Sequence, residues 1–105
     1  MEPRSVHLRR DDLQIVDVRE YDEWAAGRIA GARHIPLAEL PARLAELDRD
    51  RPVVTVCRSG NCSGQAAAYL TRAGLSALNM DGGMKRWSRE RLPFSTPDGR
   101  PGRIG

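Results

Sequence analysis

The most restrictive feature of this sequence is an apolar segment followed at once by a cysteine, a glycine-bearing loop and a helical pattern. Residues 52–56 read PVVTV, and such runs are typical of strands covered on both faces. Residues 58–62 are expected to form the loop, and a helix is expected from Ser63, its N-cap, to about residue 72. A buried strand that leads directly into a helix is characteristic of an α/β fold with a mainly parallel sheet.

The rest of the chain continues the alternation. Further strands are expected at residues 14–18 and 76–80, an extended piece at residues 35–36, and helices at residues 20–26, 37–47 and 84–90. The helix over residues 37–47 is inferred from leucines that recur every three or four positions, with Pro41 near its start. Ligands of such sheets bind at the carboxyl ends of the strands, where Cys57 and Asp17 both fall.

Length and composition indicate a single soluble domain. The chain has 105 residues, of which 40% are hydrophobic and 30% charged, within the usual size of one compact domain. Its longest apolar runs are far shorter than the roughly 20 residues of a membrane span. The first residues lack the apolar stretch of a signal peptide. We therefore expect a cytoplasmic protein that does not bind a membrane.

The net charge of +3 is unevenly distributed. Residues 85–105 hold six basic and two acidic side chains, whereas residues 1–84 hold 11 basic and 12 acidic ones. A basic tail can contact an acidic partner, or it can be a solvated chain end. Because no aromatic side chains alternate with the basic ones, a nucleic-acid platform is not expected.

Two cysteines, Cys57 and Cys62, are too few for a disulfide scaffold. A structural zinc site needs four ligands. The chain adds only two histidines to its cysteines, without paired spacing, so no metal site is expected. The thiols are therefore expected to be available for chemistry.

Cys57 is the best candidate for a reactive thiol. It is expected to stand between a strand and the start of a helix, where unpaired N–H groups and the helix dipole favour an anion. Such a cysteine ionises more readily than a free one. Gly60 allows the loop backbone to turn tightly, and Arg58 adds a positive charge. The alternative is an inert cysteine that ends a buried strand.

Three ordered motifs extend from residue 17 to residue 87. The loop reads CRSGNCS over residues 57–63. Upstream, residues 17–20 read DVRE and residues 27–36 read GRIAGARHIP. Downstream, residues 81–87 read DGGMKRW. Together these motifs resemble the rhodanese-like sulfurtransferase family, whose loop is often CRSGNRS.

The resemblance implies a fold and an activity. It implies a rhodanese-like three-layer α/β domain over residues 6–93, in which helices flank a mainly parallel central sheet, followed by an irregular basic tail over residues 94–105. The thiolate of Cys57 would take sulfane sulfur from thiosulfate or a persulfide donor and pass it to cyanide or a thiol, free or on a protein. No cofactor or metal is required. Amides of the loop would bind donor and persulfide, so the expected substrate-binding residues are Arg58, Ser59, Gly60, Asn61, Cys62 and Ser63.

Some positions depart from the family pattern or support the loop. Cys62 stands where many relatives have Arg, Ser or Thr. It either resolves the persulfide of Cys57 or forms a disulfide with Cys57, or it simply fills the place of a small residue. Asp17 and Arg19 are expected to brace the loop by hydrogen bonds or to pair with Glu20 or Glu23, rather than to react. Asn79 stands where an apolar strand residue is usual.

Other functions remain open at the level of sequence. The main alternative is a redox or sulfur-carrier module that uses Cys57 and Cys62 together. A non-catalytic docking domain is a further alternative. A cysteine phosphatase of related fold would carry C-x5-R, with the arginine clamping phosphate. Here Ser63 is the sixth residue after the cysteine.

Overall fold

A parallel four-stranded sheet forms the centre of the computed structural model, which describes residues 1–104. The strands are β1 (Gln14–Asp17), β2 (Arg33–His34), β3 (Val53–Val56) and β4 (Ala77–Asn79). They lie in the order β2-β1-β3-β4, and every neighbouring pair is parallel. The predicted α/β class and parallel sheet are therefore confirmed.

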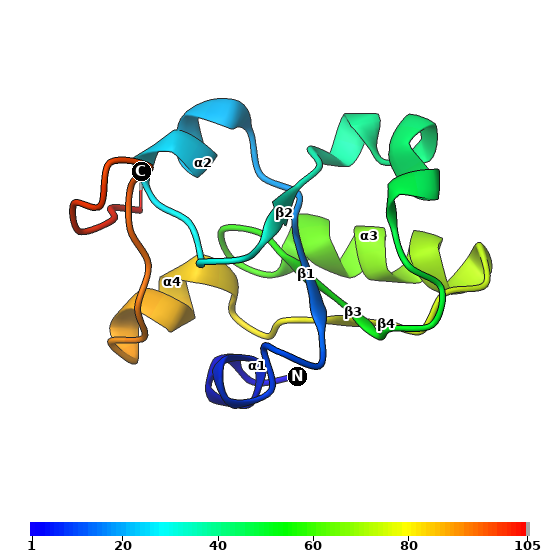
Figure 1. Cartoon of the computed structure of the whole chain (residues 1–105), viewed down its shortest axis with the longest axis horizontal. Coiled ribbons are helices and arrows are strands. Elements are labelled where there is room, and N and C mark those ends of the chain that lie inside the picture. Colours follow the sequence, from blue (N-terminus) through cyan, green and yellow to red (C-terminus); the bar gives the residue numbers. More distant parts are fainter. Residues whose placement is uncertain (105) are drawn as a thin grey trace.

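Helices cover both faces of the sheet. They are α1 (Pro3–Leu8), α2 (Tyr21–Ala26), α3 (Asn61–Arg72) and α4 (Gly83–Arg89), together with two 3-10 helices, η1 (Leu37–Glu39) and η2 (Pro41–Glu46). Figure 1 shows α1 and α4 on one side of the sheet and α3 with η1 and η2 on the other. In the described part of the chain, no helix combines the length and apolar character needed to cross a membrane.

The sheet separates two apolar clusters, as alternating side chains of a strand require. In β3, Val54 and Val56 face α1 and α4, whereas Val53 faces α3. In β1, Ile15 faces α1 and α4, whereas Val16 faces α3. Cys57, which follows β3, belongs to the cluster under α3. Its side chain therefore lies on the α3 face of the sheet.

The predicted start of α3 was wrong by two residues. The helix begins at Asn61 with Gly60 as its N-cap, so Ser63 is not the N-cap and Cys62 lies within the first turn. Gly60 adopts a φ of 103°, a left-handed conformation that glycine takes without steric cost. The chain therefore turns into the helix sooner than the serine pattern suggested.

The helix predicted over residues 37–47 was also wrong in type. Pro41 has no N–H to donate to Leu37, as an α-helix would require. The Leu40 N–H donates to the Leu37 carbonyl instead, at 3.3 Å, and the segment forms η1 and η2. The apolar face was nevertheless correct, since Leu40 and Leu47 are buried and pack under α3.

Residues 94–104, within the segment expected to be an irregular tail, lie against α2 and the loop that follows it. Ser95 and Arg28 exchange backbone hydrogen bonds of 3.0 and 3.1 Å, and the Arg103 N–H donates to the Ala26 carbonyl. Phe94 packs against the cluster under α4. The last residue of the predicted tail, Gly105, lies outside the described residues.

Candidate functional site

Cys57 stands at the carboxyl edge of the sheet, between β3 and α3. Its residue is only 4% exposed. The sulfur accepts hydrogen bonds from the Gly60 N–H at 3.0 Å and from the Ser63 hydroxyl at 3.1 Å. Both donors belong to the loop and the first turn of α3, so the helix start is directed at the thiol.

These contacts favour the thiolate. Burial raises the pKa of the Cys57 thiol, because it penalises the charged form. Hydrogen bonds from the Ser63 hydroxyl and from the backbone N–H groups of Ser63, Gly60 and Ser59 outweigh burial, so the pKa lies below its ordinary value. The arrangement can hold an anionic sulfur without a neighbouring base.

A cavity of about 220 Å³ opens at the thiol. It is lined by Val18, Arg19, Glu20, Glu23, Leu37, Cys57, Arg58, Ser59 and Cys62. Of the predicted binding residues, Arg58, Ser59 and Cys62 line it, whereas Gly60 and Ser63 contact the sulfur itself. Asn61 begins α3 and is exposed, but it does not line this cavity.

Backbone hydrogen bonds from α4 hold the start of the loop in place. The N–H groups of Met84 and Lys85 donate to the carbonyls of Cys57 and Arg58 at 2.8 and 2.9 Å. Gly83, at φ 61°, lets the two backbones meet: a Cβ at this position would lie 2.5 Å from the Cys57 carbonyl oxygen. The Asp81-Gly82-Gly83 motif thus fixes the position of the loop.

Asp17 and Arg19 form a buried ion pair beside the site. The Arg19 guanidinium donates three hydrogen bonds to the Asp17 carboxylate, at 2.9, 3.1 and 2.8 Å, and a fourth to the Gly27 carbonyl at 2.7 Å. None of these hydrogen bonds reaches residues 57–63. The pair holds the segment between β1 and α2, and so shapes the wall of the cavity that Arg19 lines.

Sequence reasoning missed several neighbours of the loop. Glu20 and Glu23 bring carboxylates to the cavity, where they also form the capping box that starts α2. Thr55, counted only as part of a strand, donates its hydroxyl to the Ser63 carbonyl at 2.7 Å. Asn79 reaches from β4 to Ser63 and Gly60. The signal for Asn79 was present, since a polar residue at that strand position is unusual.

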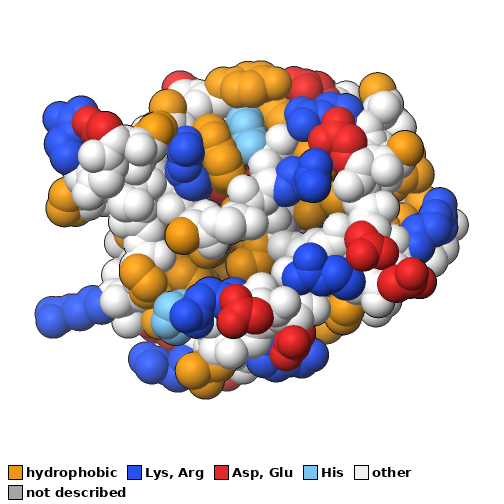
Figure 2. Space-filling model, in the orientation of Figure 1, with side chains coloured by type: hydrophobic (Ala, Val, Ile, Leu, Met, Phe, Trp, Pro, Cys, Tyr) orange, Lys and Arg blue, Asp and Glu red, His pale blue; other side chains and the backbone are white. Residues whose placement is uncertain are grey.

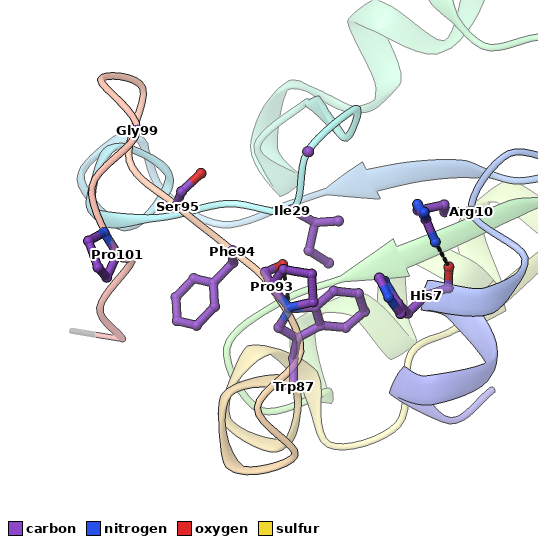
Figure 3. Close-up of a pocket in the computed structure, with 10 residues that line it drawn as sticks. His7, Arg10, Ile29, Trp87, Pro93, Phe94, Ser95, Gly99 and Pro101 are labelled. Carbon is purple, nitrogen blue, oxygen red and sulfur yellow. Dashed lines mark hydrogen bonds between the residues drawn. The ribbon is translucent and has the colours of Figure 1, made fainter.

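A larger cavity, of about 430 Å³, lies away from the thiols. Figure 3 shows the rings of Trp87, Phe94 and His7 around it, with Arg10 at one side. No cysteine lines it, so it lacks the nucleophile of the smaller cavity. Within residues 1–104 no three His, Cys, Asp or Glu side chains gather in a way that would hold a metal ion.

The outer surface carries both charges. Figure 2 shows Lys and Arg side chains interspersed with Asp and Glu side chains over the face it presents. Three ion pairs, Arg33–Glu46, Arg43–Glu39 and Arg43–Glu46, join side chains of β2, η1 and η2. No broad field of one sign covers this face.

Comparison with known proteins gives a consistent result. The model of the rhodanese-like domain matches residues 3–90. The chain is 42% identical over 90 residues to a sulfurtransferase of Allochromatium vinosum, covering 85% of this chain and 84% of that protein. It is 40% identical over 93 residues to the thiosulfate sulfurtransferase GlpE of Pseudomonas aeruginosa, covering 88% and 84%. A rhodanese-related protein of Thermoplasma volcanium superposes with a TM-score of 0.87 at 29% identity, covering 90% of this chain and 95% of the other.

Proposed function

This chain belongs to the rhodanese-like domain family, and from that premise we propose that it is a sulfurtransferase that carries sulfane sulfur as a persulfide on Cys57. Relatives named as sulfurtransferases, at 40–42% identity, support the general activity. The single observation that carries the assignment to Cys57 is its sulfur, held at 3.0 Å by a loop N–H and at 3.1 Å by a hydroxyl at the start of α3.

The first half-reaction loads the enzyme. The Cys57 thiolate attacks the sulfane sulfur of the donor, an S–S bond forms, and the donor's own S–S bond breaks. With thiosulfate the leaving group is sulfite, which departs with the electron pair. The negative charge then resides on the outer sulfur of the persulfide, where the amides of the loop stabilise it.

The second half-reaction unloads it. A cyanide ion or a thiolate attacks the outer sulfur and becomes thiocyanate or a new persulfide, and the Cys57 thiolate is regenerated. Two displacements at one nucleophile predict ping-pong kinetics. Each displacement exchanges one anion for another and transfers no proton, so the site needs preorganised donors rather than a proton shuttle.

The walls of the cavity favour a thiol persulfide over thiosulfate as donor. The charge of Arg19 is already matched by Asp17. The cavity is also lined by Arg58 and by two acidic residues, Glu20 and Glu23. A small site with this balance attracts a dianion poorly, whereas the apolar side chains of Val18 and Leu37 suit the carbon chain of a thiol.

Steady-state transfer tests this function. The wild type should transfer sulfur from thiosulfate or a thiol persulfide to cyanide, and Cys57→Ser should lose the activity. Cys62→Ser is the matched control, because it removes the other cysteine of the same cavity. Full transfer by Cys57→Ser would overturn the assignment, and release of phosphate from an aryl phosphate would favour a phosphatase instead.

A cysteine-pair function is the second candidate, because Cys57 and Cys62 are both free and line the same cavity. In this reaction the Cys62 thiol attacks the inner sulfur of the Cys57 persulfide. A disulfide forms and hydrosulfide leaves, so no external oxidant is needed. Sulfide released from the loaded wild type without an added acceptor, but not from loaded Cys62→Ser, would favour this candidate.

A further inference from the structure

Asn79 links two of the residues that hydrogen-bond the Cys57 sulfur. Its side chain extends from the end of β4 toward the start of α3. The amide nitrogen Nδ2 donates to the Gly60 carbonyl at 3.2 Å, and the oxygen Oδ1 accepts a hydrogen bond from the Ser63 hydroxyl. The Gly60 N–H and the Ser63 hydroxyl also donate hydrogen bonds to Cys57 Sγ. Asn79 therefore acts on the sulfur through both of them without touching it.

The orientation of this amide is fixed. The Gly60 carbonyl can only accept hydrogen bonds, and it already accepts one from the Gly64 N–H at 3.1 Å. A flipped Asn79 would place its own carbonyl oxygen against that carbonyl. The NH₂ group must therefore face Gly60, and Oδ1 must face Ser63.

The Ser63 hydroxyl has one proton and two acceptors. Cys57 Sγ lies 3.1 Å from Ser63 Oγ, and Asn79 Oδ1 lies within hydrogen-bond distance on the other side. A hydroxyl donates one hydrogen bond, so it serves one of these acceptors at a time. A neutral thiol can itself donate to Ser63 Oγ, which leaves the serine proton for Asn79. A thiolate cannot donate and instead requires that proton.

We propose that Asn79 is a positioning residue that competes with Cys57 for the Ser63 proton. This inference rests on the proposed function. While Cys57 is a thiol, the hydroxyl donates to Asn79. When the thiolate forms, the hydroxyl turns to the sulfur and gives up its bond to Asn79. After loading, the charge moves to the outer sulfur, the inner sulfur becomes a weak acceptor, and the hydroxyl returns to Asn79.

Charged groups near the thiol do not enter this competition. Arg19, Glu20 and Glu23 reach the cavity from the segment that follows β1, and Arg58 from the loop. On α4, Lys85 meets the loop through its backbone N–H, which donates to the Arg58 carbonyl. Among the described residues, the Ser63 hydroxyl donates only to Cys57 Sγ and Asn79 Oδ1. The position of its proton is therefore decided between these two acceptors.

The test compares two replacements of Asn79 that both lose the bond to Gly60. Asn79→Leu keeps the approximate volume but removes the acceptor, so Ser63 is free to serve the sulfur. Asn79→Asp offers a stronger acceptor and holds the proton away from the sulfur. The pH dependence of Cys57 alkylation by iodoacetamide, in Cys62→Ser protein, gives the midpoint for thiolate formation. We expect Asn79→Leu to shift it down and Asn79→Asp to shift it up, each by roughly 0.5–1 pH unit.

A double variant separates this competition from a general disturbance of the loop. In a Ser63→Ala background there is no proton to compete for, so Asn79→Leu should no longer shift the alkylation midpoint downward. A downward shift that persists without Ser63 would overturn the proposal. An upward shift in Asn79→Leu would also overturn it, because it would mean that Asn79 assists donation to the sulfur. If Asn79→Leu does not fold, Asn79→Asp decides the matter: its upward shift should be smaller in the Ser63→Ala background. An equal shift in both backgrounds would overturn the proposal, because it would come from the added charge alone.

Failure of this proposal and failure of the proposed function give different results. The alkylation profile reports the thiol alone and needs no sulfur donor. If the wild type gains no sulfur from any donor, the sulfurtransferase assignment fails while the alkylation midpoints still measure the competition. If the wild type is loaded normally but the midpoints do not move with Asn79, only the present proposal fails.

Discussion

Replacement of Gly83 by alanine should displace the Cys57 loop and so lower both stability and sulfur transfer. At this position a Cβ would lie 2.5 Å from the Cys57 carbonyl oxygen and 2.6 Å from that of Arg58. An ordinary carbon–oxygen contact is about 3.3 Å, so the loop would have to move by roughly 0.8 Å. The added Cβ would meet backbone atoms of Cys57 and Arg58, so a side-chain rotation cannot relieve the contact.

The cost should appear in both stability and rate. The left-handed φ of 61° costs an alanine about 1 kcal/mol, and the forced overlap adds about 1–3 kcal/mol. A displacement of this size at a nucleophile lowers the rate by about 100-fold. We therefore expect Gly83→Ala to lose about 2–4 kcal/mol of unfolding free energy and about 100-fold in kcat/KM for sulfur transfer.

Gly31→Ala is the matched control. Gly31 has a φ of 82°, but a Cβ there would meet nothing within 4 Å. It should lose only the conformational term, about 1 kcal/mol, and keep its transfer rate. Urea unfolding and steady-state transfer at equal folded concentration measure the two quantities. Equal transfer rates for Gly83→Ala and Gly31→Ala would refute the view that α4 fixes the loop.

Three further outcomes follow from the same geometry. Asp17→Asn leaves the buried Arg19 guanidinium short of a counter-charge, and should lower the unfolding free energy by about 3 kcal/mol in urea titrations. Glu20→Gln removes a carboxylate from the cavity and should raise kcat/KM for thiosulfate about threefold at low salt, with less change for a neutral thiol persulfide. Because the folded pKa of Cys57 is lowered, the thiolate contributes stability above the thiol's unfolded pKa of about 8.5, and this is lost as pH falls through the folded pKa. The stability difference between wild type and Cys57→Ser should therefore shrink on acidification, and a difference independent of pH would contradict the lowered pKa.

The sequence predicted the centre of this fold well, because its pattern there is unambiguous. The run at Val53–Val56 is β-branched and ends at the cysteine, and the structure places β3 at these residues. The helix start was wrong, because a serine is a common N-cap whereas a glycine in the left-handed region carries no side-chain signal. The turns at η1 and η2 were mistaken for an α-helix, since the spacing of leucines reports the buried face and not the hydrogen-bond pattern.

Only the part of the candidate site that follows Cys57 directly in the sequence could be predicted. Residues that surround the sulfur from the same loop were all named, because they follow Cys57 directly. Those that come from other elements were missed or left without a role. Glu20 and Asn79 lie far from the loop along the chain, and only the order of the strands brings them to the same edge. A polar residue in a short strand was the clue, but its partner could not be named without the fold.

Sulfur bound to the protein itself tests the central claim most directly. Wild-type protein treated with thiosulfate or a thiol persulfide, freed of donor and weighed intact should gain the mass of one sulfur atom. Peptide mapping should place that atom on Cys57, and the gain should disappear on addition of cyanide. Sulfur found on Cys62 instead, or an equal gain in Cys57→Ser, would contradict the account.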